Sequence, residues 1–266
     1  MKPARRRELA CRAKVEYDVS IRVVCDVLSI SATCYFYKPT LANENAVIED
    51  WLMRLTTTHK RWGFGLCFDF LRNTKGFKWN HKRVYRIYRE LELNLRIKPR
   101  SRIKRDKPSA LAVPTKINQV WSMDFMSDSL KDGRSIRTFN VIDDCNRESL
   151  AMDFGISLPA QRVIRSLQQI IEWRGKPLAL RCDNGPEFIS HELIDWAVNE
   201  QITLLYIQPG KPTQNAYVER FNRTARQELL ELNLFEDIEH AQLLATQWQW
   251  TYNNIRPHSA IGGVPP

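Results

Sequence analysis

The amino-acid sequence predicts an α/β domain with a mixed five-stranded sheet and helical cover, preceded by an all-α region. Two observations lead to this prediction. After residue 118, three strand-like segments follow one another, and a helix, a strand, a helix, a strand and a helix come next. This order is typical of a mixed sheet covered by helices. Before residue 96, apolar residues recur at helical spacing instead.

The charge of the chain is unevenly distributed. The 266 residues, enough for one large domain or two moderate ones, carry a formal net charge of +10. Residues 1–110 hold 25 Lys and Arg against 11 Asp and Glu, whereas residues 111–266 hold 15 against 19. A front this basic favours a polyanion such as nucleic acid as its partner, and a solubilising surface is the alternative.

Neither membrane insertion nor export is expected. No stretch approaches 18 apolar residues, and the cationic start of the chain has no apolar run behind it. The cysteines form no C-x-x-C pair and no zinc-binding spacing, so we expect a cytosolic protein with reduced thiols. They are Cys11, Cys25, Cys34, Cys67, Cys145 and Cys182.

Three short helical segments open the chain. Residues 5–17 favour a helix, Ser20 is a candidate N-cap for "IRVVCDVL", and "SIS" at 29–31 is a candidate turn into "ATCYFY". This is the outline of a helix-turn-helix, although any small helical bundle has a similar pattern.

A second group of helices follows. "NAVIEDWLMRLTTTH" predicts a helix, "WGFG" interrupts it, "LCFDFLRN" resumes it, and Asn80 is a candidate N-cap for "HKRVYRIYRELEL". In this last helix Val84, Ile87, Tyr88 and Leu91 share one face. Its basic residues allow two interpretations equally well. They could form the solvated side of a helix that packs on the core, or a surface that lies against phosphates. These residues are Lys82, Arg83, Arg86 and Arg89.

The segment "RIKPRSRIKRDKPSA" at 96–110 predicts a basic linker. Its seven Lys and Arg, one Asp and two Pro show no apolar period, so we expect an extended segment that follows a nucleic-acid backbone by charge. The predicted contacts are Arg100, Arg102, Lys104 and Arg105. The chain is therefore divided into a helical DNA-binding region (1–95), a linker (96–114) and an α/β domain (115–266).

The strand-like segments of the α/β domain are bounded by turn signals. They are "QVWSMDFMSDSL", "SIRTFNVIDDC", "ESLAMDFGIS", "LALRCDNG" and "ITLLYIQ". The helical segments are "AQRVIRSLQQIIEWRG", which stops at Gly175, "HELIDWAVNEQ" and "NAYVERFNRTARQELLEL".

Three acids are candidate metal ligands. Asp124 interrupts an otherwise apolar strand, Asp183 ends the strand "LALRC" before a tight turn, and Glu219 begins a helix, with 35 residues between the last two. Clustered carboxylates repel one another unless divalent cations neutralise them, and such hard ligands favour Mg²⁺ or Mn²⁺. Two such ions would suit phosphoryl transfer. Spacing alone leaves open a hydrogen-bonded structural Asp and a solvated Glu.

Four blocks carry a family resemblance: "WSMDF", "RCDNGPEF" (181–188), "GKPTQNAYVERFNRTARQELL" (210–230) and "YNNIRPHSAIGG" (252–263). In this order they strongly resemble the second-frame catalytic subunit of the insertion-sequence-three family of bacterial transposases. The segment before the linker resembles that family's helix-turn-helix, so the resemblance covers nearly the whole chain. It implies an RNase H-like fold, shared with retroviral integrases, and a D, D, E triad on Asp124, Asp183 and Glu219.

The resemblance also implies roles for neighbours of the triad. Arg223 would hold a DNA phosphate and Lys211 would reach the substrate strand. Asn215 would cap the helix, and Gly185 would permit the turn that leaves the second acid unobstructed. One departure is Asp18, which stands where the family usually has glycine.

Other polar and aromatic residues have structural interpretations. Asp143 and Asp144 are expected to form turns and hydrogen bonds, and Glu187 to orient its loop. Trp121 is expected to anchor the core, and His258 to pack the C-terminal segment against the catalytic domain.

The predicted function is that of a DNA transposase subunit. Water would nick a 3′ end of the element, and the freed 3′-hydroxyl would attack another phosphodiester, with two Mg²⁺ or Mn²⁺ ions as cofactors. The expected partners are double-stranded DNA, further copies of the chain and the subunit from the upstream reading frame. The expected location is the nucleoid in the bacterial cytoplasm. The alternative is a catalytically silent DNA-binding regulator or a transposase remnant.

Overall fold

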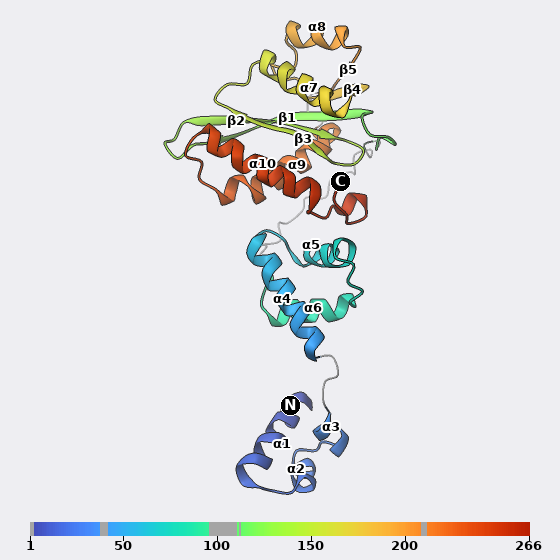
Figure 1. Ribbon diagram of the computed structural model, residues 1–266, viewed down its shortest axis with the longest axis vertical. Helices are drawn as coiled ribbons and strands as arrows, with labels where there is room; N and C mark the ends of the chain where they lie inside the picture. Colours follow the sequence, from blue (N-terminus) through green and yellow to red (C-terminus); the bar gives the residue numbers. More distant parts are fainter. Residues whose placement is uncertain (1–2, 38–41, 96–110, 112, 209–211) are drawn as a thin grey trace. The chain divides into compact units, whose positions relative to one another are not determined.

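The computed structural model describes residues 3–37, 42–95, 111, 113–208 and 212–266 (Figure 1). Contacts divide the chain into two compact units, Met1–Asp50 and Trp51–Pro266, and each is described by itself. The division falls inside the predicted helical region (1–95), so most of the second helical group shares a unit with the sheet. The predicted DNA contacts of the basic linker, and Lys211, lie outside the described residues.

Three helices pack against one another in the first unit: α1 (Pro3–Tyr17), α2 (Ile21–Val27) and α3 (Ala32–Phe36). The Ser20 hydroxyl accepts a hydrogen bond from the backbone N–H of Val23 at 3.4 Å, which confirms the predicted cap of α2. The "SIS" turn ends at Ser31, whose hydroxyl caps α3.

Asp18 lies in the turn between α1 and α2 with φ 47°, in the left-handed region. Glycine enters this region without steric cost, and Asp is among the few other residues that tolerate it. The turn therefore has the backbone conformation that the family's glycine would favour, although the residue is Asp.

The second helical group consists of α4 (Ala42–Thr58), α5 (Phe64–Asp69), a π-helical turn (Phe70–Thr74) and α6 (His81–Glu90). Asn80 caps α6 by accepting a 2.9 Å hydrogen bond from the backbone N–H of Lys82. Val84, Ile87 and Tyr88 are buried, as the helical period predicts. Of the basic residues on the other faces, Lys82, Arg86 and Arg89 are exposed.

A mixed five-stranded sheet forms the centre of the second unit, as predicted (Figure 1). Its order is β3-β2-β1-β4-β5, with β1, β2 and β3 antiparallel and with β4 and β5 parallel to β1. The strands are β1 (Val120–Ser129), β2 (Ser135–Asp143), β3 (Ser149–Gly155), β4 (Ala179–Cys182) and β5 (Thr203–Tyr206).

Helices cover both faces of the sheet (Figure 1). On one face α7 (Ala160–Arg174) and α8 (His191–Asn199) bury a core that includes Trp121, the predicted anchor, at 0% exposure. On the other face α9 (Ala216–Glu228) and α10 (Ile238–Asn254) bury a second core around Phe221. Short 3-10 turns at Pro212–Asn215, Leu230–Leu232 and Ser259–Ile261 complete the described elements.

Helix α10 is the element that the sequence patterns do not predict. Its buried positions include the small residues Ala241 and Ala245, with Tyr252 further on, while the large Leu243 and Trp250 are exposed. Because large apolar side chains do not mark its buried face, the helical period is weak.

Candidate active site

Asp124 lies on β1, and Asp183 directly follows Cys182, the last residue of the neighbouring parallel strand β4. In the β1–β4 register Ser122 is opposite Arg181, and each Asp comes two residues later in its chain. Side chains two residues apart share one face of a strand. We infer that the two carboxylates share one face at the carboxyl edge of the sheet, where ligands of α/β proteins bind.

The Asp124 carboxylate is held by two hydrogen bonds. Its Oδ1 accepts from the backbone N–H of Phe125 and its Oδ2 from the side-chain amide of Asn222, both at 2.8 Å. Burial is the largest cause that raises the pKa of Asp124, to about 6. The charges of Asp183 and Glu219 raise this pKa as well, and the two hydrogen bonds oppose the rise. Both acids therefore lie close enough to act on Asp124.

Glu219 lies in the first turn of α9. Burial raises the pKa of its carboxyl group, and the charge of Arg223 lowers it. Arg223 is exposed one turn further along the helix, which leaves its guanidinium accessible to a solvent-borne anion.

Asn222 joins α9 to the sheet through a chain of side-chain hydrogen bonds. Its Oδ1 accepts from the amide of Asn140 on β2, and the Oδ1 of Asn140 accepts from the hydroxyl of Thr138, both at 2.8 Å. Asn140 is also opposite Asp124 in the β1–β2 register. The sequence patterns did not predict this network. Its one signal in the sequence is the amide residue Asn140 in the middle of an apolar strand.

Gly185 fixes the orientation of Asp183. Its backbone N–H donates a 2.9 Å hydrogen bond to Oδ1 of Asp183, and a Cβ at position 185 would stand 3.0 Å from that oxygen. The backbone of Gly185 does not have a positive φ. Position 185 therefore favours glycine because a side chain there would lie too close to the Asp183 carboxylate.

The predicted capping role of Asn215 is wrong for its side chain. Asn215 precedes α9 but makes no side-chain cap hydrogen bond. It is buried, its Nδ2 donates to the carbonyl of Met123 at 3.3 Å, and its Oδ1 has no hydrogen-bond partner among the described residues. The side chain binds β1 instead of its own helix, beside the strand position of Asp124.

The other acids near the site have the structural roles predicted for them. Asp143 is buried and accepts hydrogen bonds from the backbone N–H groups of Asn118 and Cys145, both at 2.8 Å. Asp144 is buried and forms an ion pair with Arg181. A similar ion pair joins Glu187 to Arg137 and holds the loop after Asp183.

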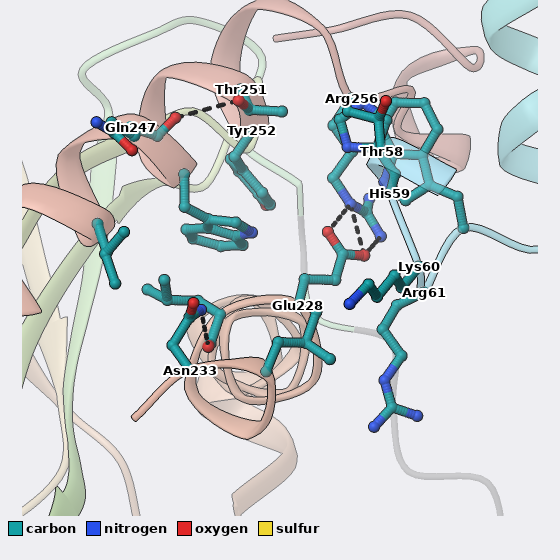
Figure 2. Close-up of a pocket in the computed structure, with 15 residues that line it drawn as sticks. Thr58, His59, Lys60, Arg61, Glu228, Asn233, Gln247, Thr251, Tyr252 and Arg256 are labelled. Carbon is teal, nitrogen blue, oxygen red and sulfur yellow. Dashed lines mark hydrogen bonds and ion pairs between the residues drawn. The ribbon is translucent and has the colours of Figure 1, made fainter. Parts of the chain in front are cut away.

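The "YNNIRPHS" block fastens the C-terminal segment to the catalytic domain. Arg256 makes hydrogen bonds to both carboxylate oxygens of Glu228 at 2.8–3.0 Å, beside a cavity of about 380 Å³ (Figure 2). His258 is buried and its Nε2 donates to the carbonyl of Tyr252 at 3.0 Å. Burial lowers the pKa of His258 to about 4. The predicted packing role of His258 is thus confirmed.

No set of three His, Cys, Asp or Glu side chains in the described part of the chain is arranged to hold a metal ion. Besides burial, the charges of Asp183 and Glu219 raise the pKa of Asp124, but the three acids do not form such a closed cluster. Their donor atoms are carboxylate oxygens, the ligand type that Mg²⁺ and Mn²⁺ prefer. The donor set therefore fits these ions.

The predicted DNA-binding residues Lys82, Arg83 and Arg86 lie on α6. They are on a different element from the three acids and far from them in sequence. Arg86 is 3.6 Å from Glu90, an exposed pair of little energetic weight. Among the described residues, no helix has the length and apolar character that crossing a membrane requires.

Known proteins share this architecture and sequence. The integrase core domain family matches residues 114–212 and 200–266. The insertion element IS476 uncharacterized 39.2 kDa protein of Xanthomonas euvesicatoria is 37% identical over 99% of this chain and 76% of its own length. The insertion element IS407 uncharacterized 31.7 kDa protein of Burkholderia multivorans is 37% identical over 97% of this chain and 92% of its own.

A solved structure shows the same fold at low sequence identity. The simian T-cell lymphotropic virus intasome, in complex with a PP2A regulatory subunit, superposes with a TM-score of 0.50 and 19% identity, over 71% of this chain and 69% of that chain. Together with the domain matches, this defines a DDE polynucleotidyl transferase with an RNase H-like catalytic core. The chain belongs to the insertion-element transposases that carry an integrase core domain.

Proposed function

We propose that Asp124, Asp183 and Glu219 are the catalytic carboxylates for metal-dependent DNA strand cleavage and strand transfer. The observation that carries this proposal is electrostatic. Asp124 is half-buried, and besides this burial its pKa is raised by the charges of Glu219 on α9 and of Asp183, which follows β4, although both acids are distant in sequence. The three carboxylates would hold two Mg²⁺ or Mn²⁺ ions, which when bound supply activation of the attacking oxygen and stabilisation of the leaving one.

The chain's own residues would orient this site. Asn222 holds one oxygen of Asp124 toward α9, and the backbone N–H of Gly185 holds one oxygen of Asp183. Arg223, exposed one turn beyond Glu219, would bind a phosphate next to the scissile bond. Fixed ligands and a positioned phosphate bring the nucleophile and phosphorus together without reorganisation at the moment of reaction.

The basic front of the chain would hold the DNA outside the active site. Lys82, Arg83 and Arg86 of α6 would contact phosphates, and so would the linker residues Arg100, Arg102, Lys104 and Arg105. We retain the functional division into a DNA-binding region (1–95), a linker (96–114) and a catalytic domain (115–266). Replacing the four linker residues by Gln should make duplex affinity less steeply dependent on salt, and an unchanged slope would refute the linker contacts.

Assembly and location follow from the reaction. Joining two element ends to a target requires several active sites, so we propose a homo-oligomer on double-stranded DNA, with the upstream-frame subunit as a further partner. Lys211, in the loop before α9, would contact the substrate strand. The place of action would be the bacterial nucleoid.

The decisive experiment is cleavage of an element-end duplex in Mg²⁺ by the wild type and by Asp183→Asn. This change is nearly isosteric and removes a metal ligand, so cleavage should fall by several orders of magnitude while DNA binding persists. Asp195→Asn is the matched control, because Asp195 is an exposed acid on α8, and it should cleave like the wild type.

The same experiment separates the alternative function. A wild type that binds DNA and cleaves with neither Mg²⁺ nor Mn²⁺ would support the silent regulator or remnant. Equal cleavage by wild type and Asp183→Asn would instead show that the chemistry depends on other residues.

A further inference from the structure

A second cavity lies along α9, away from the three acids. Its volume is about 530 Å³. Tyr217, Arg220, Phe221 and Thr224 line it, and their i, i+3, i+4, i+7 spacing places them on one face of the helix. Glu219 and Asn222 belong to a different face, since at about 100° per residue they lie roughly on the opposite side of the helix axis. The cavity is therefore distinct from the carboxylate site.

Arg147 is the most unusual residue of this cavity. It lies in the turn between β2 and β3 with φ 68°, in the left-handed region that is costly for a long side chain. Its guanidinium carbon is 3.6 Å from the centre of the Tyr217 ring. Its Nη1 is buried and has no hydrogen-bond partner within the described part of the chain. A strained backbone thus holds a stacked guanidinium that retains an unused donor.

Two further arginines approach the same cavity. Burial raises the pKa of the Tyr252 hydroxyl, and the charges of Arg256, Arg147 and Arg220 oppose that rise, so all three guanidinium groups lie around Tyr252. Arg256 is already paired with both oxygens of Glu228. Arg220 is exposed and, like Arg147, has no ion pair at salt-bridge distance with a described residue.

The described acids near the cavity form no salt bridge with Arg147 or Arg220. Asp144 acts on Arg147 but is paired with Arg181, and Glu228 is paired with Arg256. Asp69 is the carboxylate on the cavity wall, contributed by the segment Gly63–Asp69, and burial raises its pKa. Among the described lining residues, two unpaired guanidinium groups and aromatic walls thus outnumber a single carboxylate, a lining suited to an anion.

We propose that this cavity binds a phosphate group of the DNA backbone through Arg147 and Arg220. The proposal takes DNA as the substrate from the proposed function and adds a second contact on the opposite side of α9. Guanidinium groups are the preferred protein partners of phosphate because their N–H donors match its oxygens. The strained turn would keep Arg147 in place before DNA arrives, so less side-chain freedom is lost on binding.

The test is the salt dependence of binding to an element-end duplex without divalent ions, which needs no catalysis. For Arg147→Gln with Arg220→Gln, the slope of log affinity against log salt should decrease by about 1, because one phosphate loses its protein contact, and affinity should fall at least about tenfold at low salt. Arg165→Gln is the control, because Arg165 is an exposed arginine on α7, across the sheet. A double variant whose slope matches that of the control would overturn the proposal.

Two further measurements distinguish a DNA phosphate contact from a folding effect and from a site for free anions. Arg147→Lys keeps the charge and should keep the slope within about 0.3 of the wild type, whereas a slope like that of the double variant would show a folding effect and refute the phosphate contact. Inorganic phosphate provides the other arm. Stabilisation of the wild type by phosphate, combined with an unchanged DNA slope in the double variant, would assign the cavity to free anions and also refute the DNA contact. If the wild type bound DNA but did not cleave it, the proposed function would fail, whereas the result for DNA binding at this cavity would still stand.

Discussion

The side-chain amide of Asn222 donates a 2.8 Å hydrogen bond to Oδ2 of Asp124, and so ties α9 to the central strand of the sheet. Glu219 stands one turn before Asn222 on the same helix. The same hydrogen bond therefore orients one acid and fixes the helix that carries another. Asn140 and Thr138 extend the connection into the buried part of β2.

Asn222→Ala should weaken metal binding without weakening DNA binding. Loss of a group that orients a metal ligand typically costs about 10–100-fold in metal affinity, so the Mg²⁺ concentration for half-maximal cleavage should rise by about that factor. The measurement is a Mg²⁺ titration of cleavage at saturating DNA. Asn253→Ala is a matched control, because Asn253 hydrogen-bonds the backbone of Ser149 away from the acids. An unchanged Mg²⁺ requirement would assign Asn222 to packing alone.

Asp124→Asn should stabilise the protein at pH 7 in the presence of a chelator. The unfolded chain loses the Asp124 proton near the ordinary pKa of 3.8, and the folded chain near 6. Stability therefore falls as pH rises through this window and stays lower above it. The variant should gain about 2 kcal/mol at pH 7 and nothing below pH 4, measured by urea unfolding. A gain equal to that of Asp128→Asn on the same strand would contradict this account.

His258 should make the protein sensitive to acid. Its folded pKa is near 4 and its ordinary value is 6.5, so the unfolded chain binds a proton first as pH falls. The contribution of His258 to the free energy of unfolding is complete above pH 6.5 and is lost as pH falls toward 4. Between pH 7 and pH 5 the loss is about 2 kcal/mol. His258→Gln should lack this dependence in urea unfolding at the two pH values. Equal pH dependence in both proteins would show that other groups cause the acid sensitivity.

Glu228→Gln should destabilise the catalytic domain by about 3 kcal/mol, because it leaves the Arg256 guanidinium buried without its counter-charge. Each side chain of this pair is 12% exposed. Adding Arg256→Met should recover part of the loss, since the isolated charge is then gone. Thermal unfolding measures both, with Asp132→Asn as the control from an exposed ion pair. No recovery in the double variant would mean that the pair acts through shape alone.

Local patterns predicted most of the fold. Ser20 and Asn80 cap the helices that they were expected to cap. The strand that carries Asp124 and the strand that ends before Asp183 lie where alternation and turn signals placed them. These features succeed because they depend on neighbours in sequence. Helix α10 escaped prediction because small residues such as Ala241 and Ala245 supply part of its buried surface.

Long-range polar contacts were beyond local patterns. Asn215 has the residue type and position of an N-cap, yet a carbonyl 92 residues earlier in the chain takes its amide hydrogen bond. Asn222 and Asn140 are 82 residues apart, and only the folded sheet shows that they meet. The triad itself was placed by family motifs, because spacing alone could not distinguish a metal ligand from a structural acid.

The close approach at Gly185 affects how copies of such an element are judged in a genome. Any other residue there would bring a methyl-sized group against the oxygen of Asp183. We expect a copy with alanine at 185 to cleave less well than the wild type, because the Asp183 carboxylate must shift by a few tenths of an ångström, although all three acids remain. A survey that scores only the acids would therefore overestimate how many copies can still move.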